Sequence, residues 1–76
     1  MPLKSGEQNL LDNFGANVRR IRMSRGWTLE HLANTANIEL SQVYRLEKAK
    51  INPKLTTIII LCNALEVKPE ELIVLK

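Results

Sequence analysis

Residues 28 to 47 read TLEHLANTANIELSQVYRLE, and the course of the chain on either side can be worked out from this stretch. Thr28 is a good N-cap for a helix of about two turns, because its hydroxyl oxygen can accept a free backbone N–H of the first turn. Asn37 follows that helix, and asparagine is second only to glycine in adopting the left-handed backbone of a helix end. A second helix is expected over residues 40 to 48. The stretch therefore predicts two short helices joined by a sharp turn.

The second of these helices has two faces of opposite character. At 3.6 residues per turn, Val43 and Leu46 point to one side of it. The other side carries a row of hydrogen-bonding side chains: Ser41, Tyr44, Arg45 and Lys48. Ala33, in the first helix, is small enough to let the second helix approach closely. In a helix-turn-helix arrangement the second helix lies in the major groove of DNA, so the polar row is the expected reading face.

The N-terminal third of the chain predicts one further helix. Its apolar residues recur at three- and four-residue spacing: Leu11, Phe14, Val18 and Ile21. The helix should stop at Gly26, which can take the left-handed conformation that closes a helix. Residues 1 to 9 mix proline, serine and glycine with polar residues and show no periodicity, so we expect a flexible N-terminal arm there.

Residues 55 to 76 predict two more helices. One should start at Thr56 or Thr57 and bury its apolar residues at core spacing. Pro69, followed by two glutamates, is a helix-start signal, and the last helix is expected to run to the chain end. No strand pattern or internal repeat is visible. The sequence therefore predicts an all-α fold, a compact five-helix bundle in which residues 10 to 76 form a single domain.

Composition agrees with a small helical protein inside the cell. Apolar residues make up 45% of the 76 and aromatic ones 4%, which predicts an aliphatic core. The single cysteine, Cys62, lies in an apolar run and cannot form an internal disulfide, so a reducing cytoplasm is expected. No stretch approaches the roughly 18 apolar residues of a membrane span, and the N-terminus has no signal-peptide pattern. We expect a soluble, cytoplasmic protein with no membrane partner.

Charge and chemistry favour binding over catalysis. The net charge is +3, and residues 1 to 54 hold nine lysines and arginines against five acidic residues. This basic excess weakly favours an anionic partner. One histidine, one cysteine, no glycine-rich phosphate loop and no recognisable acidic pair leave an enzyme without support. No metal, cofactor or small-molecule ligand is expected.

Three segments carry a family resemblance: VRRIRMSRGWTLEHLA at 18 to 33, SQVYRLEKAKINPKL at 41 to 55, and LCNALEVKPEEL at 61 to 72. Through them, residues 14 to 73 resemble the phage-repressor-like (Xre/Cro) family of helix-turn-helix proteins. The resemblance implies a five-helix DNA-binding domain. It also implies a dimer that binds a palindromic operator and represses or activates transcription.

Base-reading positions carried over from this resemblance fall on Leu40, Ser41, Tyr44 and Arg45. Arg45 is the best candidate for specificity, because a guanidinium can donate two parallel hydrogen bonds to guanine O6 and N7. Ser41 can donate or accept, and Tyr44 can touch a base or a phosphate. Leu40 departs from the polar residue common in the family. It either contacts a thymine methyl or extends the core stripe, and both interpretations stay open.

Phosphate contacts are expected at two places. Thr28 and His31 lie at a helix N-terminus, where free amides and the positive end of the dipole attract anions. The loop after the second helix supplies the others: Lys48, Lys50, Asn52 and Lys54. The family often has a glutamine where Leu29 stands, so one contact is missing here and the loop lysines gain importance.

Three further features of the first helix and its end have structural interpretations. By resemblance, Arg22 and Glu47 should form a partly buried ion pair that fixes the angle of the recognition helix. Trp27 is expected to cap the core, with stacking on nucleic acid as the lesser alternative. The remaining arginines are either an electrostatic funnel for DNA or a solvated face: Arg19, Arg20 and Arg25.

The run from Ile58 to Cys62 has more apolar surface than one core-facing stripe requires. Ile59 and Ile60 should point partly outward, where a monomer would prefer polar residues. We expect them, with Leu75 in the apolar C-terminal end, to bury against a second copy of the chain. Two copies impose a half-site spacing of about 34 Å, one turn of DNA.

The expected function is a sequence-specific regulator that binds double-stranded DNA as a homodimer and controls its own operon. Small stand-alone proteins of the family include phage regulators, antitoxin-type repressors and restriction-modification controllers. Repression and activation are equally compatible with the sequence. The alternative is a protein-interaction module, an antitoxin-like or anti-repressor partner that uses the same helical surface, because fold alone does not determine function.

Overall fold

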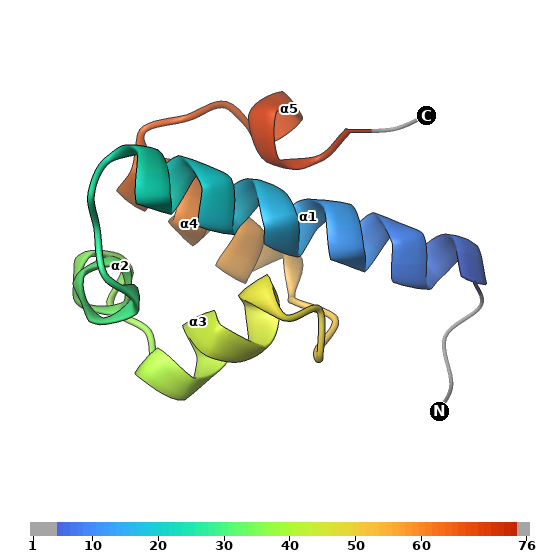
Figure 1. The fold of residues 1–76 in the computed structure, drawn as a ribbon, viewed down its shortest axis with the longest axis horizontal. Helices are drawn as coiled ribbons and strands as arrows, with labels where there is room; N and C mark the ends of the chain where they lie inside the picture. The colour runs from blue at the N-terminus through green and yellow to red at the C-terminus, as the bar shows by residue number, and fades with distance from the viewer. Residues whose placement is uncertain (1–4, 75–76) are drawn as a thin grey trace.

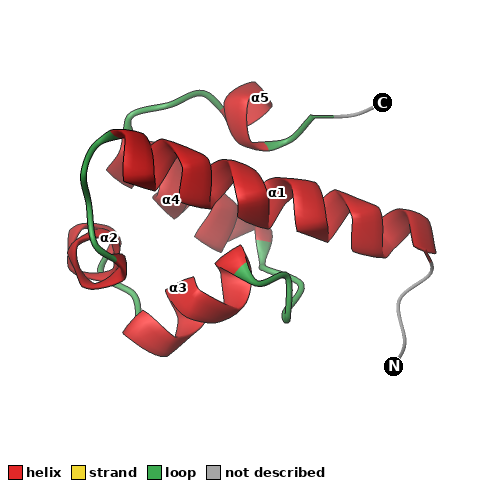
Figure 2. Cartoon of the chain, viewed as in Figure 1, coloured by secondary structure: helices red, strands yellow, loops and turns green. Residues whose placement is uncertain are grey.

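The computed structural model describes residues 5 to 74, and its regular elements are all helical (Figures 1 and 2). The helices of this range are α1 (Ser5–Ser24), α2 (Leu29–Ala36), α3 (Leu40–Glu47), α4 (Leu55–Leu65) and α5 (Pro69–Leu72). Residues 5 to 74 contain no strand. The prediction of an all-α, five-helix bundle with a helix-turn-helix is confirmed.

Helix α1 is the longest of the five helices, and α3 and α5 pack against it. In Figure 1 it runs across the molecule, with α3 below it and α5 above it. Both α3 and α5 contact α1, and α4 contacts α2 and α5. Helix α3 also contacts α2 and is therefore held between α1 and α2.

A single aliphatic core joins all five helices. Its side chains are those of Phe14, Val18, Ile21, Leu32, Ala33, Ala36, Val43, Leu46, Leu61, Cys62, Leu65 and Leu72. Phe14 is the one aromatic residue in this core, as the low aromatic content predicts. Burying each large aliphatic side chain stabilises the fold by about 1.5–3 kcal/mol. Because even the four-residue α5 inserts a fully buried leucine, Leu72, the C-terminal turn belongs to the same core.

Four chain reversals are closed by residues with left-handed backbone: Gly26, Asn37, Ala49 and Glu66. At each, the next residue donates its N–H to a carbonyl five positions back, as from Ile38 to the oxygen of Ala33 at 3.0 Å. This is the Schellman pattern of helix ends. The sequence predicts this role for Gly26 and Asn37. The turns at Ala49 and Glu66 are not predictable, because their side chains disfavour positive φ by about 1–2 kcal/mol and nothing local signals the turn.

The expected flexible arm over residues 1 to 9 is wrong for residues 5 to 9, which form the first turns of α1. Glu7 lies in the first turn, where a negative charge offsets the helix dipole. Gln8 Nε2 donates to Asp12 Oδ1 at 2.9 Å, one helical turn ahead. Local pairs of this kind do not appear in a search for apolar periodicity. Residues 1 to 4 of the arm lie outside the described range.

The last two helices also differ from prediction at their ends. Helix α4 begins at Leu55, and Thr57 is buried instead of capping the helix. Helix α5 was expected to reach the chain end but ends at Leu72, and Ile73 is extended. Asn17 Nδ2 donates to the carbonyl oxygen of Leu72 at 3.0 Å and so binds a group that the helix end leaves free.

Gly15 marks the closest approach of α1 to α3. A Cβ atom at this position would lie 2.5 Å from the carbonyl oxygen of Leu46 and 2.7 Å from that of Glu47. Both obstacles are backbone atoms, so no side-chain rotation can relieve the contact. The absence of a side chain at Gly15 therefore lets the end of α3 lie directly on α1.

We predict different effects for two glycine substitutions in α1. Gly15→Ala should lower the free energy of unfolding by about 1–3 kcal/mol, because the methyl group forces α1 and α3 apart. Gly6→Ala, where a Cβ meets nothing within 4 Å, should be neutral or stabilise by up to about 1 kcal/mol. Urea unfolding of both variants measures the difference. Equal effects would contradict the proposed backbone contact.

Candidate nucleic-acid interface

The turn between α2 and α3 has the geometry that the sequence predicts. Thr28 caps α2, and its Oγ1 accepts the backbone N–H of His31 at 3.0 Å. Asn37 has φ 56° and ψ 46° at the other end of α2. Ala33 is buried between the helices, so its small side chain permits the close crossing of α2 and α3. Two short helices and a tight turn are thus held as one unit.

Helix α3 separates its residues as its sequence pattern predicts. Val43 and Leu46 are 0% and 1% exposed and belong to the core. All four predicted base-reading side chains are exposed: Leu40, Ser41, Tyr44 and Arg45. Leu40 is 47% exposed, which excludes the interpretation that it extends the core stripe. The outward face of α3 therefore combines a cation, two hydroxyls and an apolar side chain.

The predicted phosphate-binding residues are exposed at both ends of this unit. Thr28 and His31 lie at the start of α2. Lys48 follows α3, and its Nζ lies 5.9 Å from the ring centre of Tyr44, a cation–π distance. The other members occupy the α3–α4 loop and are also exposed: Lys50, Asn52 and Lys54. Lys48, a predicted phosphate contact, and Tyr44, a predicted base-reading residue, are therefore close together on the surface at α3.

Arg22 and Glu47 form a bidentate ion pair between α1 and the end of α3. Arg22 Nε donates to Glu47 Oε2 at 2.7 Å, and Nη2 donates to Oε1 at 3.0 Å. The side chains are 10% and 4% exposed. Arg22 Nη1 also donates to the carbonyl oxygen of Trp27 at 2.7 Å. One guanidinium thus joins α1, the α1–α2 loop and the recognition helix.

Trp27 is half-buried and packs against the core, as its predicted role as a cap requires. Gly15 is a supporting residue that the sequence does not reveal, because a glycine inside a helix gives no sign of which element comes close to it. The Cys62 thiol is buried, and burial raises its pKa, with the Glu71 carboxylate acting in the same direction. The neutral thiol therefore behaves as a small apolar core group.

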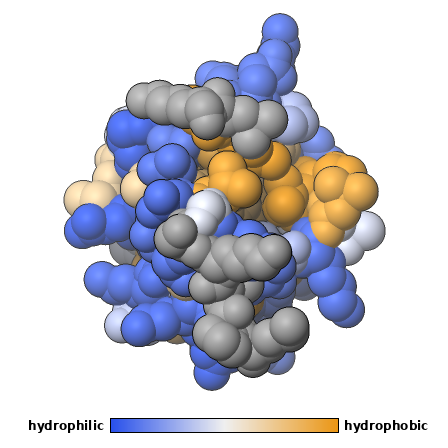
Figure 3. All heavy atoms as spheres, turned by 90° about the vertical axis from the view of Figure 1, so that its right-hand side faces the viewer, coloured by the Kyte–Doolittle hydropathy of each residue, from blue (hydrophilic) through white to orange (hydrophobic). Residues whose placement is uncertain are grey.

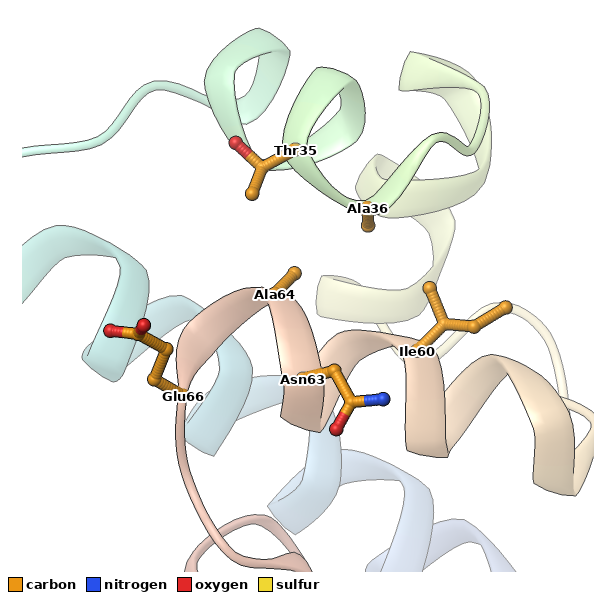
Figure 4. Close-up of a pocket in the computed structure, with 6 residues that line it drawn as sticks. All are labelled: Thr35, Ala36, Ile60, Asn63, Ala64 and Glu66. Atoms are coloured by element: carbon orange, nitrogen blue, oxygen red, sulfur yellow. The ribbon is translucent and has the colours of Figure 1, made fainter.

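Ile59 and Ile60 point outward, with 46% and 39% of their surface exposed. They lie on different sides of α4. Figure 4 shows Ile60, Asn63 and Ala64 of α4 across a hollow from residues 35 and 36 of α2. Ile59 follows Leu55 by one turn, and Leu55, at 71%, is the most exposed large apolar residue of the part of the chain that the structure describes. Leu75, the third residue expected at a dimer interface, lies outside the described residues.

Another groove, lined mostly by apolar residues, lies at the end of the molecule where α1 begins. It is lined by Leu10, Leu11, Phe14, Asn52, Pro53, Ile58 and Ile73. In Figure 3, which faces this end, hydrophobic side chains gather in one patch beside a hydrophilic region. Asn52, a residue of the basic α3–α4 loop, also lines this groove. No helix within residues 5 to 74 is long and apolar enough to cross a membrane. The same residues contain no cluster of three side chains suited to a metal ion.

The anchored α3 and the capped α2 define a helix-turn-helix protein of the kind that binds DNA. A family model described as helix-turn-helix matches residues 18–72. The chain belongs to this family, the Xre/Cro-like helix-turn-helix proteins. The family and the similar structures are those of DNA-binding transcriptional regulators.

Solved structures similar to this chain include three regulators. The restriction-modification controller protein C.AhdI from Aeromonas hydrophila has 34% identity and a TM-score of 0.79, and the match covers 82% of this chain and 94% of that one. The hypothetical transcription factor NHTF from Neisseria has 28% identity and a TM-score of 0.84, with 97% and 86% covered. The clp gene regulator ClgR from C. glutamicum, at 24% identity, TM-score 0.78 and coverage of 95% and 86%, shows likeness of fold. No curated protein sequence matches the chain.

We predict that Arg22→Ala lowers the free energy of unfolding by about 3–5 kcal/mol, because it leaves the Glu47 carboxylate buried without its partner. Arg20→Ala removes the same charge from an exposed position and should change stability by about 0.5 kcal/mol or less. Arg22→Lys should fall between them, since an ammonium cannot make the bidentate contact. Thermal and urea unfolding test the order. Equal melting temperatures for the two alanine variants would defeat the prediction.

Proposed function

We propose that this chain is a sequence-specific regulator that binds a palindromic operator in double-stranded DNA as a homodimer. The observation that carries the proposal is the state of α3. Its inner side chains are fully buried and its end is held by Arg22, while its outer polar side chains are exposed. A helix fixed in this way meets base edges without first having to be ordered.

Arg45 is proposed as the main specificity residue. Its side chain is exposed on the outward face of α3, and a guanidinium matches the O6 and N7 acceptors of guanine in the major groove. Ser41 lies one turn earlier on the same face and can donate to or accept from a neighbouring base. Leu40, exposed at the N-terminal end of α3, is suited to a thymine methyl group.

Backbone contacts are proposed on both sides of this reading face. Thr28 and His31 serve one strand from the start of α2. The basic residues after α3 serve the other: Lys48, Lys50 and Lys54, with Asn52 between them. Contacts to phosphates set the register of α3 on the duplex, whereas contacts to bases select the sequence.

The homodimer is proposed to form through the apolar surface of α4. Three large apolar side chains of α4 are exposed, Leu55 at 71%, Ile59 at 46% and Ile60 at 39%, and an apolar surface of this kind is typical of an interaction site. Because Ile59 and Ile60 diverge around α4, a partner that covers both must sit across the outer side of the helix. Leu75 is proposed to join this surface from the C-terminal end.

We further propose that the chain regulates the operon that encodes it. Similarity to a restriction-modification controller, at 34% identity over 82% of the chain, supports this role. Action in the cytoplasm and the absence of enzymatic activity belong to the same proposal. The buried neutral thiol of Cys62 and the exposed lone His31 provide no nucleophile–base pair that would favour catalysis.

Selection of bound sequences from a random duplex pool tests this function. The parent chain should select a palindrome with half-sites about one helical turn apart. Arg45→Ala should lose about 1–3 kcal/mol of discrimination at one position in each half-site and accept other bases there. Arg45→Lys should lose part of this discrimination, and Arg20→Ala should select the same sequence as the parent chain. Binding should weaken steeply with salt.

Two results would contradict the DNA-binding proposal. The first is that the parent chain enriches no sequence from the random duplex pool. The other is binding that does not change with salt, which favours the protein-interaction module instead. Selection of an asymmetric site by a monomer would contradict the palindrome and the dimer while leaving DNA binding in place.

The dimer surface is tested by sedimentation. Ile59→Glu/Ile60→Glu should convert a dimer into a monomer, since a glutamate carboxylate buried against apolar surface is strongly unfavourable. The single variants locate the centre of the interface, because the two side chains diverge. Met23→Glu, which charges an apolar residue of α1 that is 55% exposed, is the matched control and should keep the dimer mass. A double variant with the parent's mass and stability would show that the interface lies elsewhere.

A further inference from the structure

The α1–α2 loop and the first turn of α2 carry a row of three side chains in contact: Arg25, Trp27 and His31. The guanidinium carbon of Arg25 lies 5.9 Å from the centre of the Trp27 ring. The rings of Trp27 and His31 are 4.4 Å apart between centres and tilted by 57°. Trp27 therefore has both a permanent cation and an imidazole next to its ring. We call these three side chains the Arg25–Trp27–His31 row.

The backbone beneath the row is fixed at each point. Gly26, with φ 70°, closes α1 and donates its N–H to the Met23 carbonyl oxygen at 2.9 Å. The carbonyl oxygen of Trp27 accepts the 2.7 Å hydrogen bond from Arg22. The N–H of His31 donates to Thr28, the cap of α2. The row is thus attached to the same framework that holds the recognition helix.

Arg25 has its charge available for a partner outside the chain. It is exposed, and no carboxylate of residues 5 to 74 lies within ion-pair distance of it. Stacking on an aromatic face leaves the edge N–H groups of a guanidinium free to donate. By contrast, Arg20 lies about 200° around α1 from the buried Val18, on the far side from the core, and has no aromatic neighbour. The structure therefore distinguishes arginines that the sequence treats alike.

The same pairing recurs at the end of α3. The chain has three aromatic residues other than histidine, and Phe14 is in the core. Each of the other two has a cation over its ring, Arg25 over Trp27 and Lys48 over Tyr44. Lys48 is already a proposed phosphate contact. An aromatic platform under a cation is thus present on both sides of the reading face.

We propose that Arg25 is a DNA-phosphate contact and that Trp27 is the positioning residue that holds its guanidinium beside the start of α2. This inference rests on the proposed DNA-binding function and extends it. An arginine already held at cation–π distance from a ring loses less rotamer freedom when it meets a phosphate than a free one does. His31, whose ring centre lies 4.4 Å from that of Trp27, places its imidazole next to the same ring.

Salt titration of binding tests the proposal, with two duplexes as probes: the sequence selected by the parent chain and an unrelated duplex of equal length. Arg25→Ala should weaken binding to both by a similar factor and reduce the slope of log K against log salt by about 1. Trp27→Leu keeps apolar cover over the core but removes the ring face, and should reproduce part of the loss. In the Trp27→Leu background, Arg25→Ala should then cost a smaller factor than in the parent. Trp27→Tyr should restore the parent behaviour.

The controls separate a contact from a general charge effect. Arg20→Ala removes one positive charge away from the row and should change the slope less than Arg25→Ala does. Thermal unfolding establishes that each variant is folded at the titration temperature. Equal slopes for the two arginine variants, or losses for Trp27→Leu and Arg25→Ala that simply multiply, would overturn the inference while the proposed function stands. A parent chain that binds neither duplex would overturn both.

Discussion

Helix α3 has eight residues, and a helix of that length is only marginally stable by itself in water. Its position depends on the bidentate contact between Arg22 and Glu47, which lies under its last turn. The same guanidinium binds the Trp27 carbonyl, so the α1–α2 loop and the end of α3 share one anchor. A buried pair of this kind adds little net stability compared with apolar packing, but half of it alone is costly. Its contribution is therefore to select one orientation of α3 over others.

The sequence was sufficient to predict the helix-turn-helix because each part of it has a local signal. Thr28 has a capping hydroxyl, Asn37 tolerates left-handed backbone, and Val43 with Leu46 shows helical spacing. The start of α1 at Ser5 was not predictable, since its support comes from polar pairs and not from apolar residues. Gly15 was missed for another reason. Its importance comes from a carbonyl that is more than 30 positions away, at Leu46, and only the packed structure brings the two together.

The candidate site also has features that the sequence predicts and features that it does not. Helical periodicity predicts which side chains of α3 point outward, and the structure adds that Leu40 is one of them. Contacts between exposed groups do not follow from periodicity. The distances from Arg25 to Trp27 and from Lys48 to Tyr44 depend on rotamers and on the loop geometry. Ile59 and Ile60 are neighbours in the sequence, but only Ile60 faces α2 across a hollow. The sequence gives no sign of this difference.

Ala49 and Glu66 turn the chain with positive φ although each has a side chain that resists it. The strain at each site is about 1–2 kcal/mol, a notable fraction of the 5–15 kcal/mol by which small domains are usually stable. Glycine would relieve it at both positions. The domain is therefore less stable to heat than its fold permits. Substitutions at these two turns are a route by which laboratory evolution can raise its thermal tolerance without altering the surface of α3.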